Sequence, residues 1–267
     1  MIDPQRSLSL PDLQAMKTRG EKIAALTAYD ATFAMAMDQA GVDLILVGDS
    51  LGMVVQGQAT TLPVTMDHMA YHAACVRRAV HRAVLAVDLP FMSYASPPQA
   101  LDSAARLMRE CGAQMVKLEG GRGRLEVVRA LAAQDIPVCA HLGLLPQSIH
   151  RLGGYRVQGR DDRSAQLLLE DAVLLQEAGA AMLVLECVPA SLASEITLAL
   201  AIPTVGIGAG PGCDGQVLVS YDMLGLTPHC PRFCRNFLAD ARGIPEALAS
   251  YVRAVRESEF PAPDNGF

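Results

Sequence analysis

The stretch Ala40-Gly41-Val42-Asp43-Leu44-Ile45-Leu46-Val47-Gly48-Asp49 decides the fold, because its pattern recurs twice later in the chain. The two further copies are Cys111-Gly112-Ala113-Gln114-Met115-Val116-Lys117-Leu118-Glu119-Gly120 and Ala178-Gly179-Ala180-Ala181-Met182-Leu183-Val184-Leu185-Glu186-Cys187. Each copy has a small residue, a glycine, a short apolar run and a carboxylate. Glycine just past a helix takes the left-handed conformation that ends it, and a continuous apolar run fits a parallel strand covered on both faces. Each copy therefore predicts a helix end and a buried strand that finishes in an acid.

Other segments continue this alternation of helix and strand. Further strands are expected at Ile23–Tyr29, Val84–Leu89, Val138–Leu142, Thr204–Gly208 and near Val217–Ser220. Helix starts are indicated by cap residues and early prolines: Asp30 before a helix to Gly41, Thr65 before one through Arg82, Ser96 with Pro97 and Pro98 before one to Gly112, and Ser164 before one to Gly179. Alternating strands and helices in this number predict an α/β fold, a closed (β/α)8 TIM barrel. An open doubly wound sheet is the alternative, but no dinucleotide fingerprint follows the first strand at Asp30.

No linker rich in proline, glycine and serine divides the chain, so one domain is expected. Residues 1–20 are expected to form a segment with a short helix, Pro11–Arg19, that closes one end of the barrel. Residues 21–255 form the barrel catalytic domain, and residues 256–267 form a frayed C-terminal tail.

The composition excludes several classes of protein. Apolar residues make up 51% of the 267 residues and charged residues 19%, a balance that excludes extended disorder. The net charge is −6 without a block of like charges, which argues against a nucleic-acid partner. The apolar runs are too short to cross a membrane, and the first six residues have no apolar signal core, so a cytoplasmic location is expected. The seven cysteines are scattered, and most of them lie in apolar surroundings that indicate reduced core thiols.

Polar residues gather at the ends of the expected strands, where barrels of this type place their active sites. These residues are Asp49 and Ser50 after the second strand, Asp88 on the third, Lys117 and Glu119 on the fourth, His141 on the fifth and Glu186 on the sixth. Carboxylates that converge on one rim repel each other unless a cation compensates their charge. Oxygen ligands from a few carboxylates, completed by water and substrate, suit Mg²⁺.

Lys117 has two possible roles. A lysine in the middle of a barrel strand can form a Schiff base, but such an amine must be neutral. Glu119 lies two residues further on, on the same face of the strand, and a neighbouring carboxylate keeps a lysine charged. We therefore favour a cation that stabilises negative charge on a substrate oxygen. The long segments 51–63 and 144–162 are typical of lids or binding loops.

Ordered motifs along nearly the whole chain resemble those of one family. They are Leu26-Thr27-Ala28-Tyr29-Asp30, Val47-Gly48-Asp49-Ser50-Leu51-Gly52-Met53-Val54-Val55, Thr61-Leu62-Pro63-Val64-Thr65, Asp88-Leu89-Pro90-Phe91-Met92-Ser93-Tyr94, Val116-Lys117-Leu118-Glu119-Gly120, His141-Leu142-Gly143-Leu144 and Gly206-Ile207-Gly208-Ala209-Gly210 with Asp214-Gly215-Gln216. The chain resembles the ketopantoate hydroxymethyltransferase (3-methyl-2-oxobutanoate hydroxymethyltransferase) family.

The resemblance implies a homodecamer of barrels, each with one Mg²⁺, that transfers a hydroxymethyl group from 5,10-methylenetetrahydrofolate to 3-methyl-2-oxobutanoate. The product is 2-dehydropantoate, on the route to pantothenate and coenzyme A. The roles it implies are Mg²⁺ ligation by Asp49, Asp88 and Glu119, 2-oxoacid binding by Asp49, Ser50, Asp88 and Lys117, an active-site histidine at His141, and proton acceptance by Glu186.

This chemistry is self-consistent, because a metal chelated by a 2-oxoacid stabilises the enolate that a carboxylate base creates. Two rival functions stay open on the sequence. One is an enolate-forming enzyme of the phosphoenolpyruvate mutase and isocitrate lyase type, and the other is a non-catalytic barrel that serves as an assembly subunit.

Overall fold

Eight parallel strands form a closed barrel in chain order in this computed structural model, which describes residues 6–228 and 230–267. The strands are β1 (Ile23–Thr27), β2 (Leu44–Val47), β3 (Val84–Asp88), β4 (Met115–Glu119), β5 (Val138–Gly143), β6 (Met182–Glu186), β7 (Thr204–Ile207) and β8 (Gly215–Leu218). The ring closes between β1 and β8, where Ile23 pairs with Gly215 and Ala25 with Val217. The expected TIM barrel is confirmed, and the open sheet is wrong.

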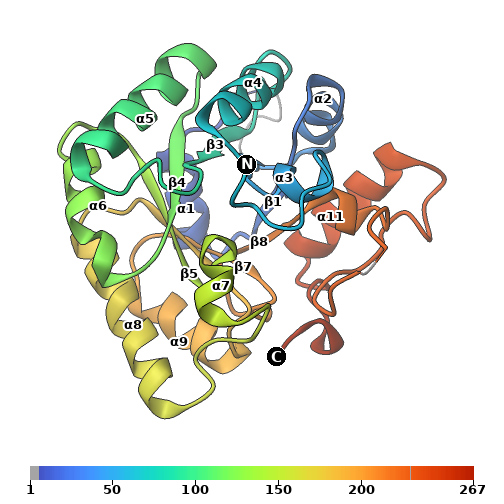
Figure 1. Cartoon of the computed structure of the whole chain (residues 1–267). Coiled ribbons are helices and arrows are strands. Elements are labelled where there is room, and N and C mark those ends of the chain that lie inside the picture. Colours follow the sequence, from blue (N-terminus) through green and yellow to red (C-terminus); the bar gives the residue numbers. More distant parts are fainter. Residues whose placement is uncertain (1–5, 229) are drawn as a thin grey trace.

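Helices surround the barrel and also lie over its two ends (Figure 1). They are α1 (Leu10–Arg19), α2 (Ala31–Ala40), α3 (Leu51–Val54), α4 (Met66–Arg77), α5 (Pro97–Cys111), α6 (Leu125–Ala132), α7 (Ile149–Leu152), α8 (Asp162–Glu177), α9 (Ala190–Ala199), α10 (Ser220–Met223) and α11 (Ile244–Arg256), with 3₁₀ turns at Arg122–Arg124, Pro146–Ser148 and Pro263–Asn265. Within the described ranges, none of these helices has the length and apolar character that crossing a membrane requires.

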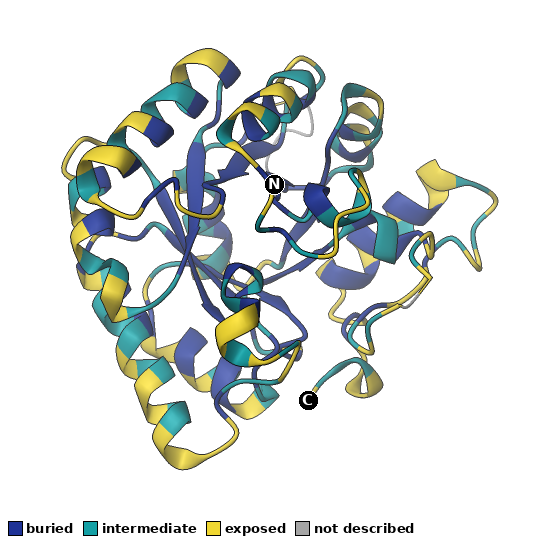
Figure 2. Cartoon of the chain, in the orientation of Figure 1, coloured by how far each residue is buried: buried dark blue, intermediate teal, exposed yellow. Residues whose placement is uncertain are grey.

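The strands and the inner faces of the helices form one core. Each of β1 to β5 is buried along its whole length, as continuous apolar runs predict for a sheet covered on both faces. Helix α5 turns Ala100, Ala104, Leu107 and Cys111 inward, a spacing of three and four residues that gives a helix one apolar stripe. Figure 2 shows this division, with buried strands at the centre and exposed residues on the outer faces of the helices.

Two helix boundaries differ from those expected. Asp30 caps α2 as expected by accepting a hydrogen bond from the Phe33 N–H at 2.9 Å. Helix α4 ends at Arg77 instead of Arg82, because the carboxylate of Asp38 accepts the main-chain N–H groups of residues 81–83 and holds them out of the helix. Helix α8 begins at Asp162, and its cap is Asp161, whose carboxylate accepts from the Ser164 N–H at 3.0 Å.

Strand β8 begins two residues before the expected segment. The prediction missed these two residues because Gly215 and Gln216 are not apolar. Gly215 passes so close to β1 that a Cβ atom there would lie 2.4 Å from the Ile23 carbonyl oxygen. Only glycine permits this approach. Gln216 follows it and is buried, with its amide donating to the Gly210 carbonyl at 3.0 Å.

Helix α1 lies at the amino-terminal ends of the strands. Leu13 and Met16 are buried there, and Lys17 pairs with Asp214, just before β8, at 2.7 Å. The first five residues of the expected 1–20 segment lie outside the described residues. Next to β2, the buried Asp43 carboxylate accepts from Arg82 at 2.7 Å and from Arg256 of α11 at 3.1 Å. These charge-assisted contacts join α11 and the segment before β3 to the amino-terminal end of the barrel, which is the end away from the predicted site.

The C-terminal segment is ordered against the barrel, so the expectation of a frayed tail is wrong. Phe260 is buried and contacts the rings of Phe237 and Tyr251. The Phe267 carbonyl accepts a hydrogen bond from the Ala190 N–H at 3.0 Å. Apolar burial of Phe260 explains the order, because a free tail would leave this side chain in water.

Candidate active site

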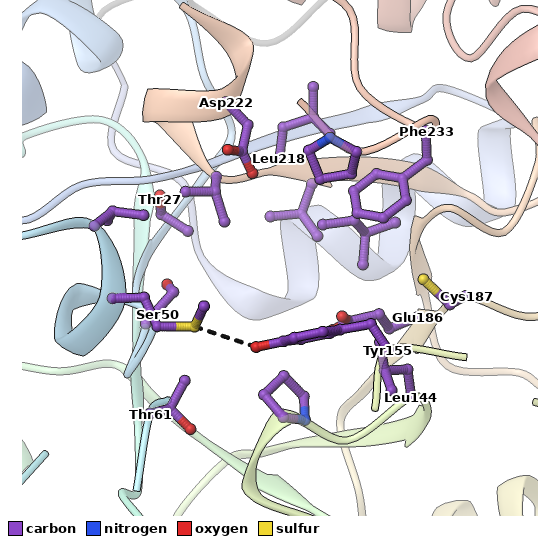
Figure 3. A pocket seen from close by; sticks show the side chains of 18 of the residues that line it. Thr27, Ser50, Thr61, Leu144, Tyr155, Glu186, Cys187, Leu218, Asp222 and Phe233 are labelled. Atoms are coloured by element: carbon purple, nitrogen blue, oxygen red, sulfur yellow. Dashed lines mark hydrogen bonds between the residues drawn. The ribbon is translucent and has the colours of Figure 1, made fainter. Parts of the chain in front are cut away.

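All seven site residues predicted from the sequence line one cavity at the carboxyl ends of the strands. They are Asp49, Ser50, Asp88, Lys117, Glu119, His141 and Glu186. The cavity encloses about 1280 Å³. Figure 3 shows part of its wall, with Ser50 and Thr27 on one side and Glu186 and Cys187 on the other. The barrel therefore brings together side chains that are up to 137 positions apart in sequence, from Asp49 to Glu186.

A buried ion pair forms the floor of the site. The Lys117 ammonium donates to Asp88 Oδ1 at 2.7 Å, and both side chains are nearly inaccessible to solvent. Burial alone would lower the pKa of Lys117, but the surrounding carboxylates, Asp88 foremost, raise it above its usual value. Lys117 is therefore a cation at neutral pH. This agrees with the interpretation of Lys117 as an electrostatic group and disfavours a Schiff base, which needs a neutral amine.

The carboxyl group of Asp49 is buried next to two other acidic side chains, Asp88 and Glu119. The main-chain N–H of Asp49 donates to Asp88 Oδ2 at 3.0 Å, which brings β2 and β3 together at the rim. Burial, and then the charges of Asp88 and Glu119, hold the pKa of Asp49 well above its usual value, although Lys117 opposes them. Three buried acids thus face one buried ammonium, and a bound cation would favour the ionised form of Asp49 and offset this crowding.

Gln147 joins two of these carboxylates, and no motif in the sequence indicated this role. Its side-chain amide donates to Asp49 Oδ2 at 2.8 Å and to the Leu89 carbonyl at 3.0 Å. Its main-chain N–H donates to Glu119 Oε2 at 3.0 Å, and its amide oxygen accepts from the Tyr94 hydroxyl at 2.5 Å. The only available signal was its place in the long segment 144–162 after β5. Gln147 fixes that segment onto the acidic site.

His141 and Glu186 form the opposite side of the site. His141 Nε2 lies 3.2 Å from Glu186 Oε2, and Nδ1 lies 3.7 Å from Glu119 Oε1. Neither ring nitrogen makes a well-aligned hydrogen bond among the described residues, although both are buried. Burial and Lys117 lower the pKa of His141, but the two carboxylates outweigh them, and the pKa rises to about 9. The carboxylate of Glu186, 3.2 Å from the ring, favours the protonated form of the imidazole.

Gly143, at the end of β5, allows Glu186 to take its place. A Cβ atom at position 143 would lie 2.1 Å from the Glu186 carbonyl oxygen, and the backbone there has a φ of 95°. The Leu144 N–H donates to the same carbonyl at 2.8 Å. Glu186 is the most accessible of the clustered acids, with a side chain 15% exposed to the cavity. It is therefore the carboxylate best placed to exchange a proton with a ligand.

Two hydroxyl groups complete the inner wall. Ser50 Oγ lies 2.8 Å from the Tyr29 hydroxyl, so Tyr29 orients the serine that the sequence predicted. Thr61 was not predicted. It is 2% exposed and lines the cavity, and its Oγ1 has no hydrogen-bond partner among the described residues. A buried unpaired hydroxyl is costly, so Thr61 Oγ1 is available to a bound ligand.

The donor set suits a hard divalent cation. Across residues 6–228 and 230–267, no three side chains of His, Cys, Asp and Glu lie close enough together to hold a metal ion by themselves. Mg²⁺ usually takes only one or two protein carboxylates, with water and substrate oxygens as its other ligands. Asp49 and Asp88 meet this requirement, because adjacent strands hold them and the Asp49 amide joins them directly. Their excess negative charge fits a Mg²⁺ ion.

The fold and the site define an enzyme of the (β/α)8-barrel class, with acidic and basic groups at the carboxyl ends of its strands. Residues 7–263 match the model of the family described as ketopantoate hydroxymethyltransferase. The chain belongs to this family. It follows that the non-catalytic alternative is wrong.

Named relatives agree with this assignment, and solved structures agree with the fold. The 3-methyl-2-oxobutanoate hydroxymethyltransferase of Methylococcus capsulatus is 61% identical over all of this chain and 98% of its own length. The enzyme of the same name from Nitrosococcus oceani is 63% identical over 95% of this chain and 97% of its own. A phosphonopyruvate hydrolase solved with oxalate and Mg²⁺ superimposes with a TM-score of 0.63 over 81% of this chain and 82% of its own, at 13% identity. At that identity the likeness shows the fold alone.

Proposed function

We propose that this enzyme transfers a hydroxymethyl group from 5,10-methylenetetrahydrofolate to 3-methyl-2-oxobutanoate and releases 2-dehydropantoate, a step towards pantothenate and coenzyme A. Membership of the family, and relatives at 61% and 63% identity that are named for this 2-oxoacid, support the reaction. The structural observation that carries it is the position of Glu186. This carboxylate faces open cavity beside His141, within the same cavity as the buried pair of Lys117 and Asp88.

One Mg²⁺ per subunit is part of this proposal, with Asp49, Asp88 and Glu119 as the ligands or outer partners. The surplus of carboxylates over cations in the buried cluster supports it. When bound, such an ion supplies Lewis-acid stabilisation of negative charge on an oxygen of the 2-oxoacid.

The residues of the chain then bind and orient the 2-oxoacid. Lys117 supplies a buried positive charge that Asp88 holds in place, and Ser50 supplies a hydroxyl that Tyr29 orients. Asp49 and Asp88 supply carboxylate oxygens on the side of the site where the proposed Mg²⁺ would bind together with the 2-oxoacid. His141 Nε2 lies 3.2 Å from Glu186 Oε2, so the imidazole helps to orient the carboxylate that accepts the proton.

Glu186 then removes the proton from the carbon next to the ketone. The electron pair of the broken carbon–hydrogen bond passes to the substrate as an enolate, whose carbon attacks the one-carbon unit. A carbon–carbon bond forms, water supplies the oxygen of the new hydroxyl group, and tetrahydrofolate leaves. General-base catalysis of this kind requires a carboxylate within reach of the substrate carbon, and Glu186 is the partly accessible one.

We also propose a homodecamer that works in the cytoplasm. Membership of the family supports this proposal. Leu198 on α9 is 87% exposed and Tyr71 on α4 is 68% exposed, so both side chains are accessible to a neighbouring subunit. Light scattering on the purified protein tests the assembly, since a decamer has ten times the mass of the chain. A mass equal to that of one chain would contradict it.

The reaction is tested with purified protein and Mg²⁺ in two assays. Incubation with 3-methyl-2-oxobutanoate in D₂O should replace the hydrogen on the carbon next to the ketone, as followed by proton NMR. Addition of 5,10-methylenetetrahydrofolate should then consume the 2-oxoacid and yield 2-dehydropantoate. Turnover of phosphonopyruvate, or carbon–carbon cleavage without folate, would instead support the enolate-forming rival. The barrel likeness alone does not favour that rival, because it is a likeness of fold.

A further inference from the structure

The cavity is much larger than the five-carbon 2-oxoacid requires. It encloses about 1280 Å³, whereas ligand pockets usually span about 300–1,000 Å³. The groups that suit the 2-oxoacid are all at the closed end, where Asp49, Asp88 and Lys117 are each no more than 5% exposed. The open end therefore has room for a second and larger molecule.

Aromatic rings line this open end. Tyr155, from the segment between α7 and α8, is 57% exposed, and Phe233 comes from the segment after α10. Figure 3 shows the ring of Phe233 above that of Tyr155 in this view, with Glu186 close to Tyr155. Aromatic side chains bind flat conjugated rings by offset stacking. A planar ligand held between Tyr155 and Phe233 would lie next to the proposed base.

Arginines surround the same end. Arg156 and Arg160 line the cavity, are exposed, and form no ion pair within the described part of the chain. Arg232 lies over the ring of Phe267 at 5.8 Å and donates to the Asp264 carbonyl at 3.2 Å. This group of cations stands out in a chain whose net charge is −6. Guanidinium groups bind carboxylates through two parallel hydrogen bonds, so the open end is suited to an anionic tail.

We propose that this open end, the outer chamber formed by Tyr155, Arg156, Arg160, Arg232, Phe233 and Phe267, is the binding site of the one-carbon donor. The inference rests on the proposed function and assigns the donor a place. The fused ring of the reduced folate stacks between Tyr155 and Phe233, which brings its one-carbon unit towards the substrate at Glu186. Its glutamate carboxylates bind Arg156 and Arg160.

The test measures binding without catalysis. Calorimetry compares tetrahydrofolate, which has ring and tail, with a tetrahydropterin that lacks the tail. In the double variant Arg156→Gln/Arg160→Gln we expect the affinity for tetrahydrofolate to fall roughly tenfold or more, because the two guanidinium groups that bind its carboxylates are lost. The affinity for the tail-less ring should hardly change. In Tyr155→Leu the affinity for both ligands should fall, because the stacking surface is lost.

A matched control separates local contacts from a general loss of positive charge. The double variant Arg151→Gln/Arg163→Gln removes two exposed arginines of the same region that do not line the cavity, and should bind tetrahydrofolate as the unchanged protein does. Equal weakening in both double variants, or unchanged affinity in Arg156→Gln/Arg160→Gln, would overturn the outer chamber as the donor site. If the unchanged protein binds no tetrahydrofolate and transfers no one-carbon unit, the proposed function itself fails. Hydrogen exchange on the 2-oxoacid needs no donor, and it reports whether the inner site of each variant is intact.

Discussion

The side-chain amide of Gln147 donates a hydrogen bond to Asp49 Oδ2 at 2.8 Å, within a cluster that also contains Glu119 and Tyr94. Asp49 lies at the end of β2 and Gln147 in the segment after β5, so this contact spans the mouth of the barrel. It holds one oxygen of a carboxylate whose pKa is raised mainly by burial and by the charges of Asp88 and Glu119, and the hydrogen bond itself opposes that rise. Gln147 is therefore a positioning residue for the acidic site.

We predict that Gln147→Leu weakens Mg²⁺ binding by about 10–100-fold, the usual effect of losing a residue that orients a metal ligand. The substitution keeps most of the side-chain volume but removes the donor to Asp49. Calorimetric titration with Mg²⁺ measures the effect. Gln134→Leu, at an exposed position, is the matched control. An affinity for Mg²⁺ that stays within about twofold of the unchanged protein would show that Gln147 does not orient Asp49.

Glu186→Gln should abolish hydrogen exchange on 3-methyl-2-oxobutanoate while the protein stays folded. Glutamine keeps the shape of the side chain but cannot accept the proton, and loss of a general base typically costs about 10²–10⁴-fold. Proton NMR in D₂O measures the exchange rate, and circular dichroism confirms the fold. Glu195→Gln, on the exposed face of α9, serves as the control. Exchange at the normal rate in Glu186→Gln would mean that another group is the base.

Asp88→Asn should reduce both stability and Mg²⁺ affinity. The change leaves the buried Lys117 ammonium without the partner that lies 2.7 Å away. Removing one member of a buried ion pair usually lowers the free energy of unfolding by about 3–5 kcal/mol. Urea denaturation measures the stability, and calorimetry measures the affinity for Mg²⁺. Asp102→Asn on the exposed face of α5 should change neither quantity. Unchanged affinity in Asp88→Asn would remove Asp88 from the proposed ligands.

Thr61→Val separates binding from folding. Because Thr61 Oγ1 is buried without a partner, its removal should leave the free energy of unfolding unchanged or slightly higher. The KM for 3-methyl-2-oxobutanoate should rise about threefold to tenfold if the hydroxyl binds this small substrate, as the loss of a neutral hydrogen bond predicts. Thr61→Ser, which keeps the hydroxyl, should have the KM of the unchanged protein. The same KM in both variants would make Thr61 a packing residue only.

The thiols should differ sharply in reactivity. Burial raises the pKa of Cys139 to about 12 and that of Cys213 to about 11, so neither forms much thiolate at pH 8. Cys230 is exposed, and Cys75 is partly exposed. Titration of the native protein with Ellman's reagent should therefore modify Cys230 first and Cys75 more slowly. Rapid reaction of the remaining thiols before unfolding would contradict the buried positions.

The sequence predicted the barrel well because its strands and helix ends follow local rules. The apolar runs before Asp49, Glu119 and Glu186 needed no knowledge of tertiary contacts, and neither did the cap at Asp30. The site residues could be assigned to one site for two reasons. They lie in motifs that resemble the family, and a barrel of parallel strands places all the carboxyl ends of its strands on one rim.

What the sequence did not predict depends on contacts between distant segments. The carboxylate of Asp38 ends α4 from another helix, and Phe260 orders the C-terminal segment by packing on Phe237. Nothing in the local sequence marks Gln147, in a 3₁₀ turn, or Thr61, in a loop, until the fold places them beside the acidic cluster. Their roles follow from tertiary position, which no local pattern encodes.

The contact between Gly143 and the backbone of Glu186 has a practical consequence for redesign. Any side chain at position 143 would collide with the carbonyl that fixes the proposed base, so this position tolerates no diversity. The exposed residues of the following segment, such as Tyr155 and Arg156, are under no such constraint from packing. A library intended to change which one-carbon donors or oxoacids are accepted should keep glycine at 143 and randomise the exposed wall beyond it.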